Sequence, residues 1–431
     1  MKIGIISLGC AKNLVDSELF LGLCQKYNLE ITNNIDDSDI ICVNTCGFID
    51  SAKLESIDTI LDLENYHLKG KIVIAMGCLV ERYKENLISE IDFVDYYVPI
   101  RDYDKFDEIF KEITNSKESY KFSYTSRVIS TGSTSAYLRI GDGCDNKCSY
   151  CAIPLIRGAY RSRPIEDILN EAKYLASLGI KEITIISQDT SKYGIDLKDV
   201  NLSILLDKLA LMNLFKTIRV LYLYPDEITD ELIDTFVKHD SIVNYFDIPI
   251  QHASFKLLKR MNRRGSKETV RELVNKIRSK MSDAIIRTTL IIGFPGETYK
   301  DHEELKEFIS EIRFERLGAF TYSDEEGTKS YTMDKKVSEK TKNKRYNEII
   351  EIQNEIATAF NKSRVGKVYE VLVESYDENM LMFKTRSIYE APDDADGYIY
   401  VKSDKQLNIG DIYKVEITDY FTYELKAKIK D

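Results

Sequence analysis

Three closely spaced cysteines, Cys144, Cys148 and Cys151, constrain this chain more than any other feature of its sequence. Their pattern is C-x3-C-x2-C. Thiolates are soft ligands that select zinc or iron–sulfur clusters over hard cations. A structural zinc site takes four protein ligands, but no further cysteine or histidine lies near these three in the sequence. A [4Fe–4S] cluster held by three cysteines leaves one iron open for a small molecule. The spacing therefore predicts such a cluster, and an incomplete zinc site or chance clustering is the alternative.

The remaining cysteines do not indicate a disulfide scaffold, because the chain has only 8 cysteines in 431 residues. Cysteines in a long chain of this kind are more often metal ligands or catalytic groups. The first residues, MKIGIISLG, lack a basic segment followed by a long apolar run and a cleavage site, so we expect no signal peptide. No apolar run reaches the length of a membrane span. We therefore expect a cytoplasmic protein that has no membrane partner.

The charge of the chain argues against broad contact with nucleic acid. Asp and Glu total 71 against 60 Lys and Arg, which gives a net charge of −11. Negative charge of this size weakens any interpretation that requires wide contact with phosphate backbones. It is compatible with a basic protein partner, although a local basic groove is not excluded by the total.

The N-terminal region, residues 1–125, alternates between apolar strands and helices. Predicted strands are Ile3–Leu8, Asp39–Asn44 and Lys71–Met76. Such alternation is typical of a parallel sheet with helices on its faces, so we predict a small doubly wound, flavodoxin-like domain.

Each of these strands is followed by a cysteine, namely Cys10, Cys46 and Cys78. The carboxyl ends of parallel strands lie at one edge of the sheet, where open α/β sheets bind ligands. We therefore predict that the three thiols converge and hold a second three-cysteine cluster with one open iron. Three unrelated buried thiols are the alternative. Cys24 and Cys42 fall within a predicted helix and a strand, and we interpret both as structural.

A second β/α series follows a polar linker at residues 126–135 and extends over residues 136–363. Six strands with crossover helices predict a partial (β/α)6 barrel, and residues 338–363 form a helical bridge at its end. Active sites of such barrels lie at the carboxyl ends of the strands, and the C-x3-C-x2-C loop follows the first of them. The predicted strands are Ala136–Ile140, Glu182–Ser187, Ile218–Leu223, Phe246–Ile250, Ile285–Ile292 and Leu317–Tyr322.

Polar residues follow three of the later strands. They are Gln188 with Asp189, Gln251 with His252, and the turn that begins at Gly293. These positions suit a bound cofactor, but loop solvation or helix capping explains each of them equally well. We do not assign His252 as a base, because a solvated or hydrogen-bonded histidine is the commoner outcome.

The C-terminal region, residues 364–431, reads as five short strands between turns. This pattern predicts a small antiparallel β-barrel of OB-like type. Such modules often bind nucleic acid through a basic groove, but acidic residues outnumber basic ones here. The stretch Asp393-Asp394-Ala395-Asp396 is expected to project from a loop tip and to attract a basic protein.

Four segments, together with both cysteine triads, make the chain resemble the methylthiotransferases, a family of radical S-adenosylmethionine (SAM) enzymes. The aromatic Tyr150 before the last cysteine also fits the radical-SAM signature. Members of this family carry three spaced cysteines in an N-terminal domain, C-x3-C-x2-C in the centre and a TRAM domain at the end. The matching segments are Ser7–Glu18, Asn44–Ala52, Ile186–Thr190 and Pro249–Ser254.

The resemblance implies an enzyme whose cofactors are SAM and two [4Fe–4S] clusters. Cys144, Cys148 and Cys151 would hold the cluster that cleaves SAM to a 5′-deoxyadenosyl radical. Cys10, Cys46 and Cys78 would hold an auxiliary cluster whose open iron carries sulfur. The residues that would contact SAM are Tyr150, Gln188, Asp189, Gln251 and Gly293; no catalytic residue is assigned beyond the cluster ligands.

Two segments, Lys12–Val15 and His252–Ala253, are most similar to the branch that acts on ribosomal protein S-twelve. That branch inserts sulfur and a methyl group at the β-carbon of an aspartyl residue and gives 3-methylthioaspartate. It implies an electron donor such as flavodoxin or ferredoxin, and a sulfur donor. Modification of an adenosine near the anticodon of transfer RNA, by the other main branch, is the alternative. A non-enzymatic iron–sulfur electron carrier is a further alternative, but it needs no large barrel with an open ligand site.

Overall fold

The computed structural model describes residues 1–132, 134–392 and 394–430. Two compact units make up the chain. The first unit contains both cysteine triads. The second contains the central strands and the C-terminal region. The first comprises Met1–Ser130, Gly141–Tyr174 and Ser323–Tyr331, and the second Thr131–Ile140, Leu175–Tyr322 and Thr332–Asp431. The domain boundaries placed at 125, 135 and 363 from the sequence stay predictions.

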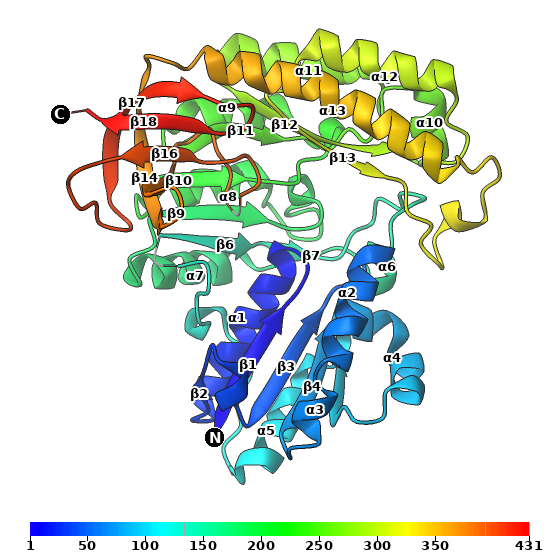
Figure 1. Ribbon diagram of the computed structural model, residues 1–431, viewed down its shortest axis with the longest axis vertical. Coiled ribbons are helices and arrows are strands. Elements are labelled where there is room, and N and C mark those ends of the chain that lie inside the picture. The colour runs from blue at the N-terminus through cyan, green and yellow to red at the C-terminus, as the bar shows by residue number, and fades with distance from the viewer. Residues whose placement is uncertain (133, 393, 431) are drawn as a thin grey trace. The chain divides into compact units, whose positions relative to one another are not determined.

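The first unit is built on a five-stranded parallel sheet in the order β2-β1-β3-β4-β5 (Figure 1). This is the flavodoxin-like order, and its topological switch point lies between β1 and β3. The predicted fold of this region is confirmed. The strands are β1 Lys2–Ser7, β2 Glu30–Ile31, β3 Ile40–Thr45, β4 Ile72–Gly77 and β5 Tyr96–Pro99, and the helices are α1 Ala11–Lys26, α2 Asp50–Leu61, α3 Glu64–His67, α4 Cys78–Glu90 and α5 Phe106–Thr114.

Alternate side chains of strand β3 enter the two cores on either side of this sheet. Ile40 and Cys42 pack with α1 and α5, whereas Ile41 and Val43 pack with α2 and α4. Successive residues of a strand point to opposite faces, so a strand covered on both sides is apolar throughout. Cys24 and Cys42 are fully buried in the first core, and burial raises the pKa of both thiols far above the ordinary value. Both cysteines are therefore structural.

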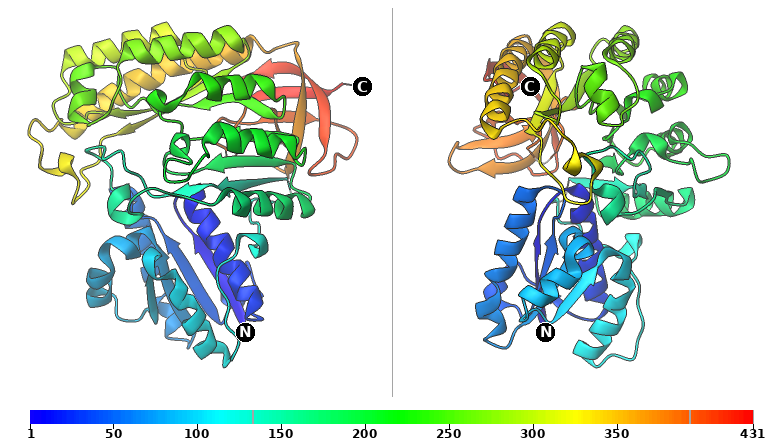
Figure 2. Two further views of the ribbon diagram at one scale, coloured as in Figure 1. Left: turned by 180° about the vertical axis from the view of Figure 1, so that it is seen from behind. Right: turned by 90° about the vertical axis from the view of Figure 1, so that its right-hand side faces the viewer.

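The second unit contains six parallel strands in sequential order, from β6 through β9, β10, β11 and β12 to β13. The helices between the strands pack on one face of the sheet (Figures 1 and 2). This arrangement confirms the predicted (β/α)6 partial barrel. The strands are β6 Ser135–Arg139, β9 Glu182–Ile186, β10 Thr217–Val220, β11 Ile242–Asp247, β12 Ile285–Ile292 and β13 Arg316–Thr321, and the helices are α8 Leu202–Leu211, α9 Asp230–Lys238, α10 Phe255–Arg260, α11 Lys267–Lys280, α12 Tyr299–Ile312 and α13 Glu339–Lys362.

The C-terminal strands form a closed barrel in the order β14-β15-β16-β18-β17. Its interior is filled by apolar side chains such as Val373, Val401 and Val415. The barrel is antiparallel as predicted, except that β16 and β18 run parallel to each other. The strands are β14 Val368–Asp377, β15 Met382–Arg386, β16 Ile399–Lys402, β17 Ile412–Tyr420 and β18 Leu425–Ile429. Among the described residues, none of the helices is both long and apolar enough to cross a membrane.

Buried ion pairs attach the C-terminal barrel to the amino ends of the central strands. Glu390 Oε1 accepts hydrogen bonds from Arg364 Nη1 at 2.5 Å and from Arg316 Nη2 at 3.2 Å, and Arg316 begins β13. Arg386 of β15 donates to Glu182, the first residue of β9, at 2.9 Å. The C-terminal barrel therefore contacts the end of the central sheet opposite to the carboxyl ends of its strands.

One residue of the acidic stretch, Asp396, takes part in the same contact between the C-terminal barrel and the central strands. Asp396 is buried, and its Oδ2 accepts hydrogen bonds from Tyr245 Oη at 2.6 Å and from the Ala391 N–H at 2.9 Å. The prediction that the stretch projects into solvent is therefore wrong for Asp396. Asp394 is exposed, and Asp393 lies outside the described residues. From the sequence alone, a run of acidic residues indicates a solvated turn, because the distant partner Tyr245 is not apparent in the sequence.

Replacing Glu390 by Gln is expected to lower the free energy of unfolding by about 3–5 kcal/mol, because Arg364 would be left buried without its charge partner. Arg316 would keep Asp396 as a partner, at 4.0 Å. Burial alone would raise the pKa of Glu390, but the two arginines outweigh it and lower the pKa to about 2. The stabilisation is therefore fully present above the ordinary value near 4.5 and is lost as the pH falls through about 2.

The measurement is urea denaturation of both proteins at neutral pH. Glu370→Gln is the matched control, because Glu370 also joins the C-terminal barrel to the centre, through Lys216 at 3.0 Å, but both side chains are about half exposed. Such a pair contributes at most about 1 kcal/mol. Equal losses in the two variants would contradict the account of the buried network.

Candidate functional site

The carboxyl ends of β1, β3 and β4 bring three cysteines to one edge of the N-terminal sheet. Cys10 precedes α1, Cys46 follows β3 directly, and Cys78 is the first residue of α4. Burial is the main cause that raises the pKa of Cys46 and of Cys78, and the neighbouring thiols, Cys10 for Cys46 and both Cys10 and Cys46 for Cys78, raise these pKa values further. Cys46 and Cys78 are buried, while Cys10 is exposed. The edge therefore presents three sulfur atoms at the switch point of the fold.

Two glycines let the backbone approach these thiols. Gly77 has φ +100°, and a Cβ atom there would lie 2.3 Å from Asn44 Oδ1. Gly9 has φ +93°, and its Cβ would lie 3.1 Å from Cys46 Sγ. Positive φ and close contact both favour glycine. A side chain at either position would push apart the strand ends that carry the cysteines.

The chemistry of this edge suits an iron–sulfur cluster. Burial raises the pKa of Cys78 to about 12, and burial also raises the pKa of Cys46. Cys46 and Cys78 therefore favour the protonated thiol, and binding of a cluster would release their protons. Cys10 is the N-cap residue of α1 and Cys78 is the first residue of α4, so both cysteines lie at helix N-termini. Three soft donors from this edge, within the part of the chain that the structure describes, match a cluster that keeps one iron open.

The second triad, Cys144, Cys148 and Cys151, lies on a loop of the same unit. A short hairpin closes the base of this loop. Strand β7 (Gly141–Asp142) pairs antiparallel with β8 (Arg161–Ser162). Within the loop, the Cys151 N–H donates to Cys148 O and the Cys144 N–H donates to Gly158 O, both at 3.1 Å. All three cysteines are partly exposed. The hairpin and these bonds fold the loop back on itself, and Tyr150 lies between the second and the third cysteine in the sequence.

Gln188 and Asp189 follow strand β9 in the second unit. Asp189 precedes the short 3-10 helix Thr190–Lys192, and its carboxylate accepts a hydrogen bond from Ser191 Oγ at 2.6 Å. Thr190 Oγ1 accepts one from the Ser187 N–H at 3.0 Å. Asp189 is buried. It therefore combines a capping position with a carboxylate at the end of the sheet where barrel enzymes bind ligands.

Gln251 and Gly293 lie at the carboxyl ends of the neighbouring strands β11 and β12. The Gln251 N–H donates to Thr289 O, and the Ile291 N–H donates to Gln251 O, both at 2.9 Å. Gln251 has φ +67°, which is a strained conformation for a residue with a side chain. Its buried Oε1 has no hydrogen-bond partner within the described part of the chain. Strain and an unpaired acceptor at one residue are typical of a binding site for a polar ligand group.

Glu297 is a residue of this site that the sequence analysis did not assign. Its Oε2 accepts a hydrogen bond from the Gly293 N–H at 2.6 Å and lies 3.7 Å from His252 Nε2. Burial opposes its ionisation, but His252, the Gly293 N–H and Arg345 together lower the pKa of Glu297. His252 Nδ1 accepts a hydrogen bond from the Ser254 N–H at 2.9 Å, and the other ring nitrogen, Nε2, faces Glu297. The carboxylate thus fixes the Gly293 turn against the end of β11. Its sequence signal was the glutamate that ends the Gly-Phe-Pro-Gly-Glu turn.

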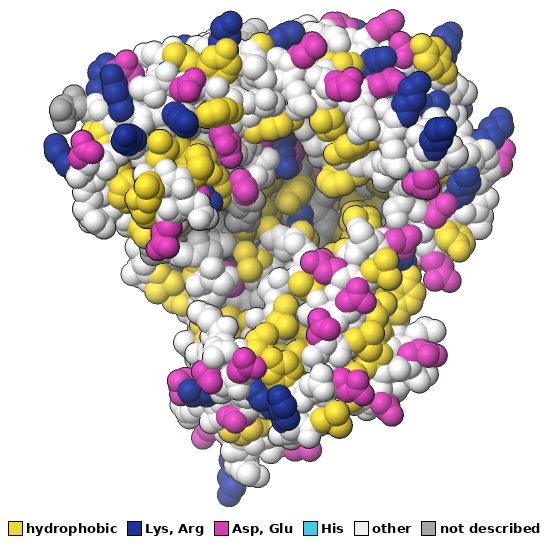
Figure 3. Space-filling model, in the orientation of Figure 1, with side chains coloured by type: hydrophobic (Ala, Val, Ile, Leu, Met, Phe, Trp, Pro, Cys, Tyr) yellow, Lys and Arg dark blue, Asp and Glu magenta, His cyan; other side chains and the backbone are white. Residues whose placement is uncertain are grey.

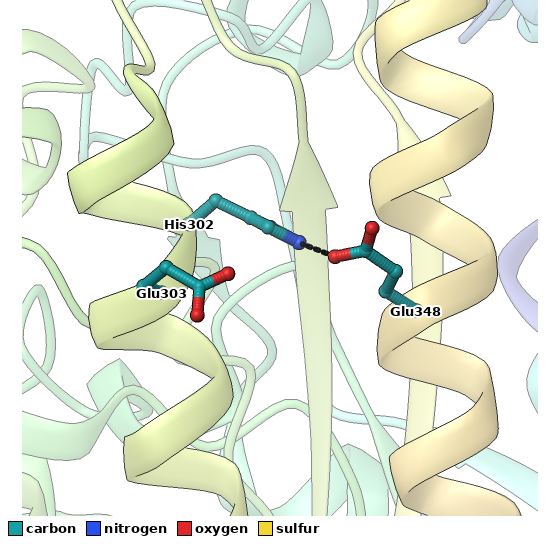
Figure 4. A group of neighbouring side chains, drawn as sticks. All are labelled: His302, Glu303 and Glu348. Carbon is teal, nitrogen blue, oxygen red and sulfur yellow. Dashed lines mark hydrogen bonds and ion pairs between the residues drawn. The ribbon is translucent and has the colours of Figure 1, made fainter.

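His302, Glu303 and Glu348 form a separate group of potential metal ligands on α12 and α13 (Figure 4). His302 Nε2 lies 2.9 Å from Glu348 Oε2. Lys306 Nζ, however, donates to Glu303 Oε1 at 3.0 Å and to Glu348 Oε2 at 3.3 Å. Because a lysine already neutralises both carboxylates, we interpret the group as an ion-pair network between two helices and not as a metal site.

Acidic and basic side chains are interspersed on the face drawn in Figure 3. No extended patch of Lys and Arg gathers on that face. Nucleic-acid-binding surfaces usually concentrate positive charge along one groove or stripe. The mixture of charges on this face agrees with the negative net charge of the chain.

Three family models match this chain. Residues 138–309 match the radical SAM superfamily. Residues 2–99 match the uncharacterized protein family UPF0004, and residues 365–429 match the TRAM domain. The three matches follow the order of the N-terminal sheet, the central strands and the C-terminal barrel.

Relatives of known name match over nearly the whole chain. The ribosomal protein uS12 methylthiotransferase RimO of Acetivibrio thermocellus is 43% identical over 99% of this chain and 98% of its own length. The proteins of that name from Clostridioides difficile and Aquifex aeolicus are 44% and 46% identical, with coverage of 100% and 99% of this chain and of 99% and 97% of their own lengths. Among solved structures, the radical SAM methyltransferase TsrM from Kitasatospora setae has a TM-score of 0.55 at 14% identity, and covers 74% of this chain and 72% of its own. At that identity the likeness concerns the fold alone.

Proposed function

The chain belongs to the ribosomal protein uS12 methylthiotransferase (RimO) family of radical SAM enzymes, and we propose that it adds a methylthio group to the β-carbon of an aspartyl residue of that ribosomal protein. The observation that carries the proposal is the likeness, end to end, to enzymes that bear this name. Modification of transfer RNA is not favoured by these relatives, nor by the charge of the chain. The cofactors of the family are SAM and two [4Fe–4S] clusters.

We assign one cluster to Cys144, Cys148 and Cys151 and the other to Cys10, Cys46 and Cys78. When bound, the clusters would supply the electron for SAM cleavage and the sulfur that is transferred. The chain itself contributes placement and exclusion of water. Buried Cys46 and Cys78 shield one side of the N-terminal site from solvent, and the hairpin of β7 and β8 holds the C-x3-C-x2-C loop.

Polar groups at the carboxyl ends of the central strands are proposed to bind SAM. The unpaired Oε1 of Gln251 and the buried carboxylate of Asp189 are suitable for its amino group or ribose hydroxyls. Gln188 is assigned to the same site because it follows β9 beside Asp189. The Gly293 turn offers backbone to the adenosyl group, and Glu297 keeps that turn in position.

Replacing Tyr150 by Ala is expected to weaken SAM binding by about 1–3 kcal/mol, the contribution of a base stacked on an aromatic ring. The expectation follows from the place of Tyr150 between two proposed ligands of the SAM-binding cluster. Equilibrium binding of SAM to the reconstituted protein measures it, with iron content determined in parallel. Tyr66→Ala is the control, because Tyr66 lies elsewhere in the first unit and donates a hydrogen bond to Asp36. Unchanged SAM affinity in Tyr150→Ala would remove Tyr150 from the cofactor site.

Three further parts of the proposal concern the surroundings of the enzyme. An electron donor of the flavodoxin or ferredoxin type is required, because SAM cleavage consumes an electron. A sulfur donor is required as well, because the inserted sulfur atom must be replaced after each turnover. We place the protein in the cytoplasm, where its ribosomal substrate is made.

The proposal is tested by offering the reconstituted enzyme both substrates under anaerobic conditions with SAM and a reductant. We expect methylthiolation of ribosomal protein uS12 and none of transfer RNA. Retention on immobilised transfer RNA at low salt adds an independent measure of binding. Modification of transfer RNA without modification of the protein would overturn the substrate assignment while leaving the radical SAM chemistry in place.

A further inference from the structure

Arg157 lies between the two cysteine triads of the first unit. It directly follows α6 (Ile153–Ile156), the short helix after Cys151, and its side chain is 2% exposed. Its Nη2 donates to Asp16 Oδ2 at 2.7 Å and lies 3.7 Å from Cys78 Sγ. A guanidinium from the segment of one triad is therefore buried against a thiol of the other.

Polar side chains from the C-x3-C-x2-C segment and from the N-terminal region both contact the guanidinium of Arg157. Its Nη1 lies 3.4 Å from Asp142 Oδ2, and Asp142 belongs to the hairpin that closes the C-x3-C-x2-C loop. Its Nη2 also donates to Asn13 Oδ1 at 3.1 Å. The Asn13 amide is itself oriented, because its Nδ2 donates to Leu8 O at 3.1 Å and to Thr45 O at 2.9 Å. The carboxylates of Asp16 and Asp142 contact Arg157 without a thiol between them, so we expect Arg157 to keep its position whether or not the cysteines carry a cluster.

The hydrogen bonds of Cys78 change when the residue becomes a cluster ligand. As a free thiol, its Sγ donates to Asn13 Oδ1 at 3.3 Å. A ligating thiolate has no proton to donate, so that bond is lost and the Arg157 N–H remains as a donor to the sulfur. Asp16 and Asp142 neutralise much of the arginine charge at a distance, but the N–H next to the sulfur still stabilises added negative charge. Hydrogen bonds to ligand sulfur atoms and local net charge are among the factors that set the potential of an iron–sulfur centre.

We infer that Arg157 is a positioning residue that raises the reduction potential of the cluster held by Cys10, Cys46 and Cys78, and that it joins this cluster site to the C-x3-C-x2-C loop. The reduced cluster carries one electron more than the oxidised one, and the arginine favours the more negative state. The inference rests on the proposed function, because the ligands of the N-terminal cluster are assigned there.

The test uses the full-length protein with Cys144, Cys148 and Cys151 changed to Ala, so that the N-terminal cluster is observed alone. Its midpoint potential is measured by a redox titration followed by electron paramagnetic resonance, with and without a second change at Arg157. At the midpoint of the parent protein, Arg157→Gln is expected to lower the ratio of reduced to oxidised cluster about tenfold, which is about 59 mV for one electron. Arg157→Lys keeps the charge but loses the planar fork. The midpoint potential of the N-terminal cluster in Arg157→Lys should therefore fall between that of the parent protein and that of Arg157→Gln.

Arg127→Gln is the matched control. Arg127 is as deeply buried in the same unit, but its ion pairs are with Glu18 and Glu171, both at 3.2 Å. We expect it to leave the potential unchanged. The inference would be overturned if the cluster had the same midpoint potential in both Arg157 variants as in the parent protein. Loss of iron from both Arg157 variants with unchanged circular dichroism would also overturn it, since Arg157 would then be needed for assembly and not for tuning. Absence of iron from the parent variant would instead contradict the ligand assignment of the proposed function.

Discussion

Replacing Cys144, Cys148 and Cys151 together by Ala is expected to abolish SAM cleavage and to leave about half of the iron, because one of two clusters of equal size loses all its protein ligands. The measurements are iron content after anaerobic reconstitution and release of 5′-deoxyadenosine in the presence of a reductant. The N-terminal thiols belong to a separate sheet edge, so their cluster should persist.

Cys24→Ala is the control for this experiment. Cys24 is fully buried in the core between α1 and α5 and lies in neither triad. Its replacement should leave both the iron content and SAM cleavage unchanged, apart from a loss of stability due to the missing sulfur atom. A full complement of iron in the triple variant, or an equal loss of iron in Cys24→Ala, would contradict the assignment of the C-x3-C-x2-C loop.

Replacing Cys10, Cys46 and Cys78 together by Ala is expected to stop formation of the methylthio product while SAM cleavage continues. Iron should again fall by about half, and SAM cleavage should continue because the C-x3-C-x2-C loop is intact. No methylthio product should form, because the site proposed to carry sulfur is gone. Product analysis by mass spectrometry and release of 5′-deoxyadenosine, measured on the same sample, distinguish these two effects.

Gly9→Ser is a second variant at the same site, and we expect it to have a smaller effect than the triple replacement. The added side chain would face Cys46 Sγ at the strained backbone of Gly9, without removing a ligand. It should reduce cluster binding at the N-terminal edge and spare the other triad. Methylthio product from the triple cysteine variant would contradict the two-cluster account.

The position of Cys10, Cys46 and Cys78 at one edge of the N-terminal sheet was predictable because it follows from topology. Parallel strands end at a common edge, so a cysteine after β1, β3 and β4 places three thiols together whatever the details of packing. The grouping of Cys144, Cys148 and Cys151 was predictable for a simpler reason, since all three cysteines lie in one short segment. Fold class in all three regions followed from the periods of apolar residues.

Contacts between distant segments were not predictable in this way. Glu297 reaches His252 across two strands, and Arg157 reaches Cys78 from a different segment of the first unit. The position of β11 was also mistaken. The sequence predicts a strand at Phe246–Ile250, but β11 is Ile242–Asp247. The apolar run continues past the end of the strand into buried residues that lead to Gln251, so hydrophobicity alone does not mark where the strand ends.

The central claim is that this chain methylthiolates ribosomal protein uS12, and mass spectrometry of that protein tests it most directly. Purified uS12 is incubated anaerobically with the reconstituted enzyme, SAM, a reductant and a sulfide source, and is then digested and sequenced by fragmentation. The account predicts a peptide heavier by one methylthio group in place of one hydrogen, with the added mass on a single aspartyl residue. The variant that lacks Cys10, Cys46 and Cys78 should give unmodified uS12 under the same conditions. Unmodified uS12 from an enzyme that holds both clusters and cleaves SAM would contradict the claim.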